Sequence, residues 1–130
     1  MTDIKAVFES TRRVAVVGVS DKPWKPSVPV AWYLDSVFEV LPVNPRHMQL
    51  MDRRCYPTLT DVPGDVDLAV IFQRDDDVLR HVAPAIEKGV RCFWMQSGIR
   101  NALARERLEA AGVLVVEDRC SKVDHIRLFA

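Results

Sequence analysis

Cationic and hydroxyl side chains gather in a proline-rich stretch that follows the first apolar run of the sequence. Lys22 and Lys25 stand between Ser20 and Ser27, and Gly18 precedes them. Ammonium groups, hydroxyls and the free amides at the start of a helix all donate hydrogen bonds to phosphate. Gly18 is the only glycine of the stretch, so the G-x-G-x-x-G fingerprint of dinucleotide-binding loops is absent. We therefore expect a phosphate-binding loop without that fingerprint, and a solvated loop with a capping serine is the alternative.

A second polar stretch follows the next apolar run. It reads Val43, Asn44, Pro45 and Arg46 and contains no acidic residue. Proteins that bind NAD usually place an Asp or Glu at this point, where it accepts a hydrogen bond from the ribose 2'-hydroxyl. A guanidinium can instead bind a phosphate on the ribose through two parallel hydrogen bonds. Arg46 thus favours coenzyme A or NADP, which carry such a phosphate, over NAD; an ordinary Val-Asn-Pro turn is the alternative.

Two further loops carry groups that could contact a nucleotide. After the third apolar run, Phe72 could flank an adenine or a pantetheine arm, and Arg74 could reach a phosphate. Arg74 could equally pair with a neighbouring acid, Asp76 or Asp77. The loop over residues 96–99 reads Gln-Ser-Gly-Ile and could bring backbone amides against a ligand.

Cys120 is the one cysteine whose surroundings favour reactivity. It stands at the expected start of the last helix, between Arg119 and Lys122, and cations and a helix N-terminus stabilise a thiolate. Cys92 lies in an apolar run and is expected to be inert core, while Cys55 is undecided. The three cysteines form no C-x-x-C pair and no zinc-ligand spacing, which predicts a reduced protein of the cytoplasm.

No catalytic or metal-binding constellation can be named in the sequence. His47, His81 and His125 are scattered, and each is expected to lie on a helix face or at a cap. A nucleophile elbow and a pair of catalytic carboxylates are missing. Phosphoacceptor domains need an acidic pair after the first strand, where Asp21 stands alone. We expect no catalytic residue and no metal.

Charge and length exclude several classes of protein. Eighteen acidic and eighteen basic residues cancel over 130 residues, which argues against a protein that binds nucleic acid through a basic surplus. No run approaches the roughly 20 apolar residues of a membrane-spanning helix, and the first residues carry no apolar signal core. We expect a single domain over residues 1–130, a cytoplasmic monomer or weak homodimer that binds neither nucleic acid nor a membrane.

Five short apolar runs must position these loops; four are rich in β-branched residues, and the run over 90–95 is richer in aromatic and sulfur-containing residues. They cover residues 14–19, 38–43, 68–72, 90–95 and 113–116 and are almost continuously hydrophobic, as are strands of a parallel sheet covered on both faces. The spacing predicts helices after Ser27 as far as Val37, over 78–86 behind the acidic run 75–77, and over 101–111 with Asn101 as the cap. Short flanking helices are expected over 3–12 and from Ser121 onward, whereas residues 44–64 show only a short turn near Thr60.

This alternation of strands and helices predicts an α/β fold. The expected form is a three-layer, Rossmann-like, doubly wound fold: a five-stranded parallel sheet with helices on both faces. Ligands of such sheets bind at the carboxyl ends of the strands, where the polar stretches described above lie.

With these motifs the chain resembles the CoA-binding domain family, small stand-alone proteins of bacteria and archaea similar to the nucleotide-binding domain of the succinyl-CoA synthetase alpha subunit. The resemblance extends from about Val14 to Leu128. Its carriers are VAVVGVSDKP (14–23), KPS (25–27), PVNP (42–45), CYPTL (55–59), WMQSGI (94–99) and DRCSKVDH (118–125). Together these motifs are specific, although each alone is weak.

The resemblance implies three groups of ligand contacts. The diphosphate loop would be lined by Gly18, Val19, Ser20, Lys22, Pro26 and Ser27. The 3'-phosphoadenosine part would meet Val43, Asn44, Pro45 and Arg46, and the nucleotide would be flanked by Phe72, Arg74 and Val78. The pantetheine end would face Gln96, Ser97, Gly98 and Cys120.

Three functions stay open at this point. The leading hypothesis is a non-catalytic module that binds coenzyme A or an acyl-CoA and forms a redox-sensitive mixed disulfide with CoA at Cys120. The second is an NADP-dependent reductase, although no proton donor or substrate domain can be named. The third is a protein-interaction module that has lost its nucleotide, with Trp24 and Trp32 as an apolar contact patch. A complete ligase is not expected, because the synthetase also needs a phosphohistidine and a second subunit.

Overall fold

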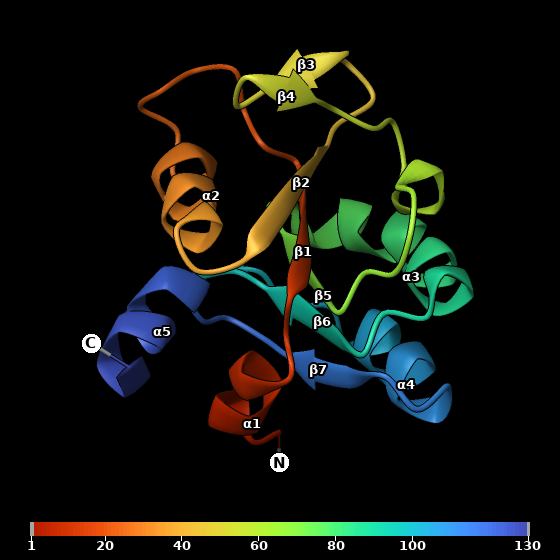
Figure 1. The fold of residues 1–130 in the computed structure, drawn as a ribbon. Coiled ribbons are helices and arrows are strands. Elements are labelled where there is room, and N and C mark those ends of the chain that lie inside the picture. The colour runs from red at the N-terminus through yellow and green to blue at the C-terminus, as the bar shows by residue number, and fades with distance from the viewer. Residues whose placement is uncertain (1, 130) are drawn as a thin grey trace.

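The central element is a parallel sheet of five strands, seen edge-on between its helices in Figure 1. The structure is a computed structural model and describes residues 2–129. The sheet order is β2 (Glu39–Val43), β1 (Arg13–Val17), β5 (Leu68–Ile71), β6 (Cys92–Met95) and β7 (Leu114–Val116). Val17 pairs with both Val43 and Ile71, so the carboxyl ends of the three strands β2, β1 and β5 lie level with one another.

Helices cover both faces of the sheet, which confirms the expected three-layer α/β fold. One face carries α1 (Ile4–Glu9), α2 (Ser27–Asp35) and α5 (Ser121–Phe129). The other carries the 3-10 turn η1 (Leu59–Asp61), the 3-10 segment η2 (Asp75–His81), α3 (Val82–Lys88) and α4 (Ala102–Ala110). None of the helices within residues 2–129 has the length and apolarity needed to cross a lipid bilayer.

Alternate residues of each strand face opposite layers, and this divides the core in two. Ala15 and Val17 of β1 join a cluster with residues of α3 and α4, whereas Val14 and Val16 join a cluster with residues of α1 and α2. Both sets are buried, because no face of the sheet meets water. Trp94 of β6 is fully buried, and its indole nitrogen donates to the Arg119 carbonyl at 2.8 Å. The continuous hydrophobic runs of the sequence therefore reflect a sheet buried from both sides.

The helix expected over residues 78–86 is replaced by two elements. Residues 75–81 form η2, and the α-helix α3 begins only at Val82. Pro84 explains the difference, because proline has no N–H and its ring clashes with the carbonyl four residues earlier, that of Arg80. Proline fits the first turn of a helix, and α3 starts so that Pro84 lies there. The other helices agree with expectation within a few residues, although Val37 lies beyond the end of α2 and is half exposed.

A small hairpin stands above the sheet where the sequence showed no regular element. Its strands are β3 (Gln49–Leu50) and β4 (Arg53–Arg54), and the turn between them has left-handed backbone at Met51 (φ 56) and Asp52 (φ 58). Such turns usually contain Asn or Gly, so the composition carried no signal for this one. Leu50, Met51 and Asp52 of the hairpin line a shallow hollow together with the loop after β1 and with α2.

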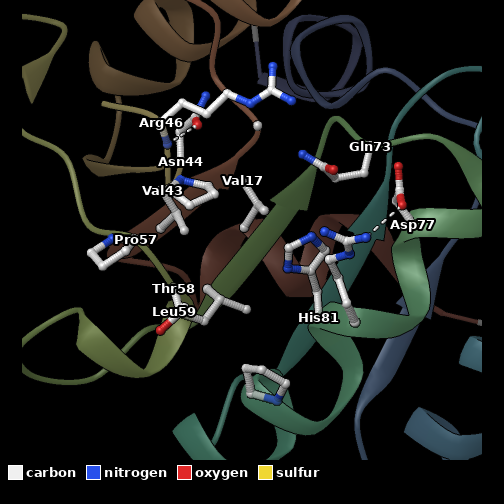
Figure 2. A pocket seen from close by; sticks show the side chains of 14 residues that line it. Val17, Val43, Asn44, Arg46, Pro57, Thr58, Leu59, Gln73, Asp77 and His81 are labelled. Carbon is white, nitrogen blue, oxygen red and sulfur yellow. Dashed lines mark hydrogen bonds and ion pairs between the residues drawn. The ribbon is translucent and has the colours of Figure 1, made fainter. Parts of the chain in front are cut away.

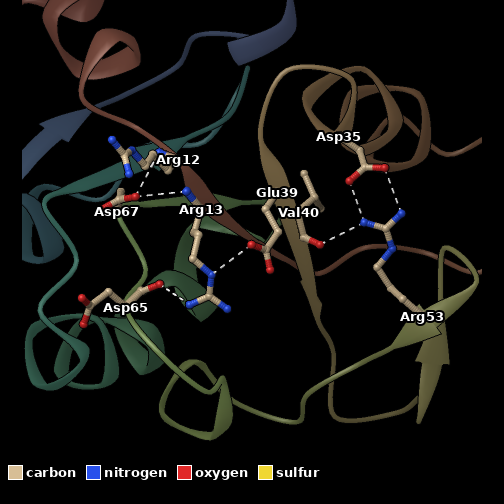
Figure 3. A network of polar contacts seen from close by, with 8 residues as sticks. All are labelled: Arg12, Arg13, Asp35, Glu39, Val40, Arg53, Asp65 and Asp67. Carbon is tan, nitrogen blue, oxygen red and sulfur yellow. Dashed lines mark hydrogen bonds and ion pairs between the residues drawn. The ribbon is translucent and has the colours of Figure 1, made fainter.

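Arg53 holds the hairpin against α2 and β2. Its guanidinium donates two hydrogen bonds to the Asp35 carboxylate, at 2.6 and 2.9 Å, and a third to the Val40 carbonyl at 3.1 Å (Figure 3). These bonds lower the pKa of Asp35 below its usual value of 3.8, because they stabilise the ionised form. A bidentate pair of this kind fixes geometry as well as charge.

The amino ends of the strands are also fixed by a carboxylate. Asp67, just before β5, accepts hydrogen bonds from the backbone amides of Arg12 and Arg13, both at 3.0 Å (Figure 3). Arg13 in turn lies 3.5 Å from Glu39 and donates to the Asp65 carbonyl. This edge of the sheet is therefore closed by its own polar contacts.

Asp35→Asn is expected to destabilise the protein by about 1 kcal/mol at pH 7, the scale of one well-ordered, partly exposed ion pair. Because the pKa of Asp35 is lowered in the folded chain, its ionised form stabilises the protein above pH 3.8 and loses this effect as the pH falls further. The difference between native and variant chains should therefore shrink below pH 3.8. Urea unfolding at pH 7 and pH 3 measures it, with Asp21→Asn as the control at an exposed acid. A difference that is equal at both pH values would contradict this account of the pair.

Candidate functional site

Two hollows lie side by side at the carboxyl ends of β1, β2 and β5, and they share Gly18 and Gln73. We call them the inner cavity, of about 470 Å³, and the outer groove, of about 370 Å³. The inner cavity is lined by Val17, Gly18, Val43, Asn44, Pro45, Arg46, Pro57, Thr58, Leu59, Gln73, Asp77, Arg80, His81 and Pro84. The outer groove is lined by Gly18, Ser20, Lys25, Pro26, Ser27, Phe72, Gln73, Arg74 and Ile99.

Gly18 forms the floor between the two hollows because no side chain fits there. Its φ is +90°, and a Cβ at this position would stand 2.4 Å from the Phe72 carbonyl oxygen and 2.6 Å from the Gln73 side-chain nitrogen. Its amide donates to the Val43 carbonyl at 2.8 Å, while the Phe72 amide donates to the Val17 carbonyl at 2.8 Å. Gly18 thus allows the ends of three strands to meet and leaves open space above them.

One wall of the inner cavity is the loop after β2, which Asn44 holds in shape. The Asn44 side chain donates to the Val19 carbonyl and accepts from the Arg46 amide, both at 2.9 Å. Asn44 therefore braces the turn, and the Arg46 side chain is left exposed at the rim of the cavity (Figure 2).

The opposite wall comes from Gln73 and η2, of which the sequence analysis had named Val78 alone as a ligand contact. Figure 2 shows Gln73, Asp77 and His81 across the cavity from Asn44 and Arg46. Asp77 accepts a hydrogen bond from Arg80 at 2.9 Å. The Nε2 atom of His81 is buried and has no hydrogen-bond partner among residues 2–129. Burial, helped by the charge of Arg80, lowers the pKa of His81 to about 4, so this imidazole is neutral at pH 7.

The outer groove offers fewer backbone donors than the sequence suggested. The Ser20 amide donates to the Ser27 hydroxyl at 3.0 Å, which folds the loop onto the start of α2. Pro26 and Pro29 have no N–H, and the Val28 amide already donates to the Lys25 carbonyl. Within the described chain, the Ser27 amide is therefore the one N–H group of the first turn that makes no hydrogen bond. Anion binding in this groove must depend on side chains, chiefly those of Lys25 and Arg74.

The structure brings most of the predicted site residues together but leaves others outside the two hollows. Val19 and Val78 are fully buried and support the walls from behind. Lys22 lies outside, with its ammonium 5.8 Å from the centre of the exposed Trp24 ring.

The predicted residues after β6 and β7 also lie outside the hollows. Gln96 is buried and accepts from the Ser121 amide at 3.0 Å, and the Gly98 amide donates to Asp118 at 2.6 Å. Ser97 is exposed, and Cys120 is partly buried just before α5. From this region it is Ile99 that lines the outer groove. The loops after β6 and β7 therefore bind chiefly to each other.

Some of the lining residues that the sequence analysis missed could have been found by extending the rule that ligands bind at the carboxyl ends of the strands. Phe72 and Arg74 were selected because they follow β5 at the ligand edge of the sheet, and Asp77, Arg80 and His81 lie one or two turns further along the same segment. Thr58 and Leu59 had no comparable signal, because the sequence does not show that η1 folds back beneath the loop after β2. No group of three metal-ligating side chains occurs within residues 2–129.

Comparison with known proteins gives consistent relatives. A family model described as a CoA binding domain matches residues 12–126. An uncharacterized protein of Bacillus subtilis, YneT, is 31% identical over 124 residues, which is 95% of this chain and 92% of the relative. The ADP-forming acetate–CoA ligase II of Archaeoglobus fulgidus is 31% identical over 92 residues; the match covers 68% of this chain but only 14% of the ligase.

Solved structures with the same fold include two small proteins. A hypothetical protein from Pyrococcus horikoshii superposes with a TM-score of 0.95 at 31% identity, covering 100% of this chain and 94% of that one. A Thermus thermophilus protein gives a TM-score of 0.93 at 33% identity, covering 99% and 100%. These structures share the five-stranded α/β arrangement described above.

Gly18→Ala is expected to destabilise the protein by about 2–5 kcal/mol, the sum of a left-handed backbone cost and of overpacking against a backbone oxygen. Gly89→Ala is the matched control, because Gly89 also has positive φ (+77°) but a methyl group added there would meet nothing within 4 Å. The control should lose only the backbone cost, about 1–2 kcal/mol. Urea unfolding measures both, and equal losses would show that the close approach at Gly18 contributes nothing.

Proposed function

Because this chain belongs to the CoA-binding domain family, we propose that it binds coenzyme A or an acyl-CoA in the inner cavity and the outer groove without catalysing a reaction. The observation that carries the proposal is the pair of hollows joined at Gly18, with a cation available in each. Coenzyme A also has two parts, a phosphorylated adenosine and a pantetheine arm, and a diphosphate joins them as Gly18 joins the two hollows.

The adenosine part fits the character of the inner cavity. Val17, Val43 and Leu59 provide an apolar lining for a flat base, and Arg46 stands at the rim. A guanidinium can bind the ribose 3'-phosphate through two hydrogen bonds. We place the adenine against these apolar side chains and the 3'-phosphate at Arg46.

The diphosphate and the pantetheine arm fit the outer groove. Lys25 and Arg74 are the cations that line it, and Gly18 lets the ligand approach the backbone closely. Phe72, Pro26 and Ile99 provide the apolar surface along which a pantetheine arm can lie. The arm would then point toward the loops after β6 and β7.

The side chains that line the outer groove favour a protein that only binds its ligand over a reductase that transfers hydride. Among the described residues that line it there is no Asp, Glu, His, Tyr or Cys. A reductase needs a proton donor beside the reacting carbon. Of the side chains that usually serve, Lys25 alone is present among the described residues lining the groove, and we assign it to the diphosphate. NADP binding therefore has less support than CoA binding from the groove itself.

Calorimetric titration of the reduced protein with CoA, 3'-dephospho-CoA and NADP tests the proposal. We expect CoA to bind about tenfold or more tightly than 3'-dephospho-CoA, the scale of one charged hydrogen-bonded contact. Arg46→Ala should reduce this difference. Arg91→Ala is the control, because Arg91 is exposed at the amino end of β6, on the opposite edge of the sheet.

The outcomes of this titration separate the three functions. Tighter binding of NADP than of CoA, followed by hydride transfer, would favour a reductase. Absence of binding by all three ligands would contradict the proposal and favour a protein-interaction module.

We also propose that the Cys120 thiol exchanges with the disulfide of oxidised CoA. Cys55 and Cys92 are buried, and burial raises the pKa of the Cys92 thiol to about 12, whereas Cys120 is partly exposed at the ligand edge of the sheet. In the exchange, the Cys120 thiolate attacks the disulfide of oxidised CoA, a protein–CoA disulfide forms, and one CoA thiolate leaves. The Cys120 sulfur is oxidised while the departing CoA sulfur is reduced, so CoA disulfide is the only oxidant required.

Incubation with CoA disulfide, followed by intact-mass measurement, tests this exchange. One CoA adduct per chain is expected for the native protein and for Cys55→Ser, and none for Cys120→Ser. A reductant should remove the adduct. An adduct of equal yield on Cys120→Ser would contradict the assignment.

A further inference from the structure

The inner cavity contains a second arginine, Arg80, on the wall that faces Arg46. Arg80 and Asp77 both belong to η2, and residues three apart in a 3-10 segment lie directly above one another. Their contact is a single hydrogen bond of 2.9 Å from one terminal nitrogen of Arg80 to one oxygen of Asp77. The side chains are 68% and 38% exposed, and ion pairs this exposed are weak.

Arginine–carboxylate pairs in the described chain are of two kinds. Arg100 with Asp118, and Arg105 with Glu109 and Glu117, form one hydrogen bond per pair, as Arg80 does with Asp77, whereas two other pairs are bidentate. Arg53 donates two hydrogen bonds to Asp35, and Arg119 donates two to Asp124. Arg80 uses one donor and keeps its remaining N–H groups free of other partners within residues 2–129. A planar guanidinium with free donors is suited to a phosphate.

The charged side chains around the inner cavity would not neutralise a bound phosphate unless a second cation contacted it. Arg46 is positive, Arg80 and Asp77 offset one another, and His81 is neutral at pH 7. A phosphate monoester carries a charge of about −1.5 to −2 at this pH. Arg46 alone cannot balance this charge, and Asp77 holds the second cation, Arg80.

From this arrangement we infer that Arg80 is a second ligand for the ribose 3'-phosphate and that Asp77 competes with the phosphate for it. This inference rests on the proposed function, because it assigns residues to the same phosphorylated adenosine. Arg80 exchanges its hydrogen bond with Asp77 for bonds to the phosphate when the ligand enters. Asp77 thereby lowers the affinity of the site for phosphorylated ligands, and Arg80 sets its preference for the 3'-phosphate.

Two variants test the inference in opposite directions. The probes are adenosine 3',5'-bisphosphate and 5'-AMP, which differ by the 3'-phosphate and lack the pantetheine arm. Arg80→Gln should weaken binding of the bisphosphate about tenfold. Asp77→Asn should strengthen it about threefold, since the competing carboxylate is removed. Neither variant should change the affinity for 5'-AMP by more than about twofold.

Asp76→Asn is the matched control for net charge. Asp76 lies beside Asp77 in η2 and is exposed, but it does not line the inner cavity. It should leave both affinities unchanged. The double variant Asp77→Asn with Arg80→Gln should bind like Arg80→Gln alone, because Asp77 acts through Arg80.

CoA binding by the native protein, measured in parallel, separates this inference from the proposed function. If CoA binds but Asp77→Asn weakens bisphosphate binding, or if either variant affects both probes equally, the inference is wrong and the proposed function stands. If the variants behave as expected but CoA does not bind, the proposed function is wrong and the site binds a smaller phosphorylated nucleoside. If the native chain binds neither the bisphosphate nor CoA, both are wrong.

Discussion

Both hollows depend on the close approach of two strand ends, where the backbone of Gly18 meets the carbonyl group of Phe72. Hydrogen bonds from Gly18 to Val43 and from Phe72 to Val17 hold the ends of β2, β1 and β5 together. Gly18 and Gln73 line the inner cavity and the outer groove alike, so any separation of these strand ends would deform both. The backbone sets the shape of the site, and the loops attached to it supply its charges.

The framework of the fold was predictable because burial dominates it. A parallel sheet covered on both faces requires continuous runs such as residues 14–19 and 68–72, and few other structures use them. The hairpin β3–β4 was not predictable in this way. Its strands have two residues each, its turn contains neither Gly nor Asn, and it is held by Arg53 through contacts with Asp35 and Val40 that are distant in the sequence. Pro84 did carry a usable signal, since it marks where the α-helical part of residues 75–88 must begin.

The site itself was predictable on one side only. The walls that directly follow strands, such as Asn44 to Arg46 and Phe72 to Arg74, could be located from the rule that ligands bind at the carboxyl ends of a parallel sheet. The facing wall from η2 depends on how a 3-10 segment turns over the sheet, which periodicity does not reveal. The same rule selected Gln96 and Gly98, yet in the structure their polar groups bind the start of α5 and Asp118. A position at the ligand edge is therefore necessary for a contact but does not ensure one.

The prolines at the start of α2 have a consequence for how this protein can change over evolutionary time. Pro26 and Pro29 remove amides that would otherwise offer a fixed, sequence-independent anion site. The attraction for phosphate then resides in solvent-exposed lysine and arginine side chains, whose replacement costs the core little. Under the proposed function, replacing one such surface residue would therefore change the preference for a ligand while leaving the sheet and Gly18 intact.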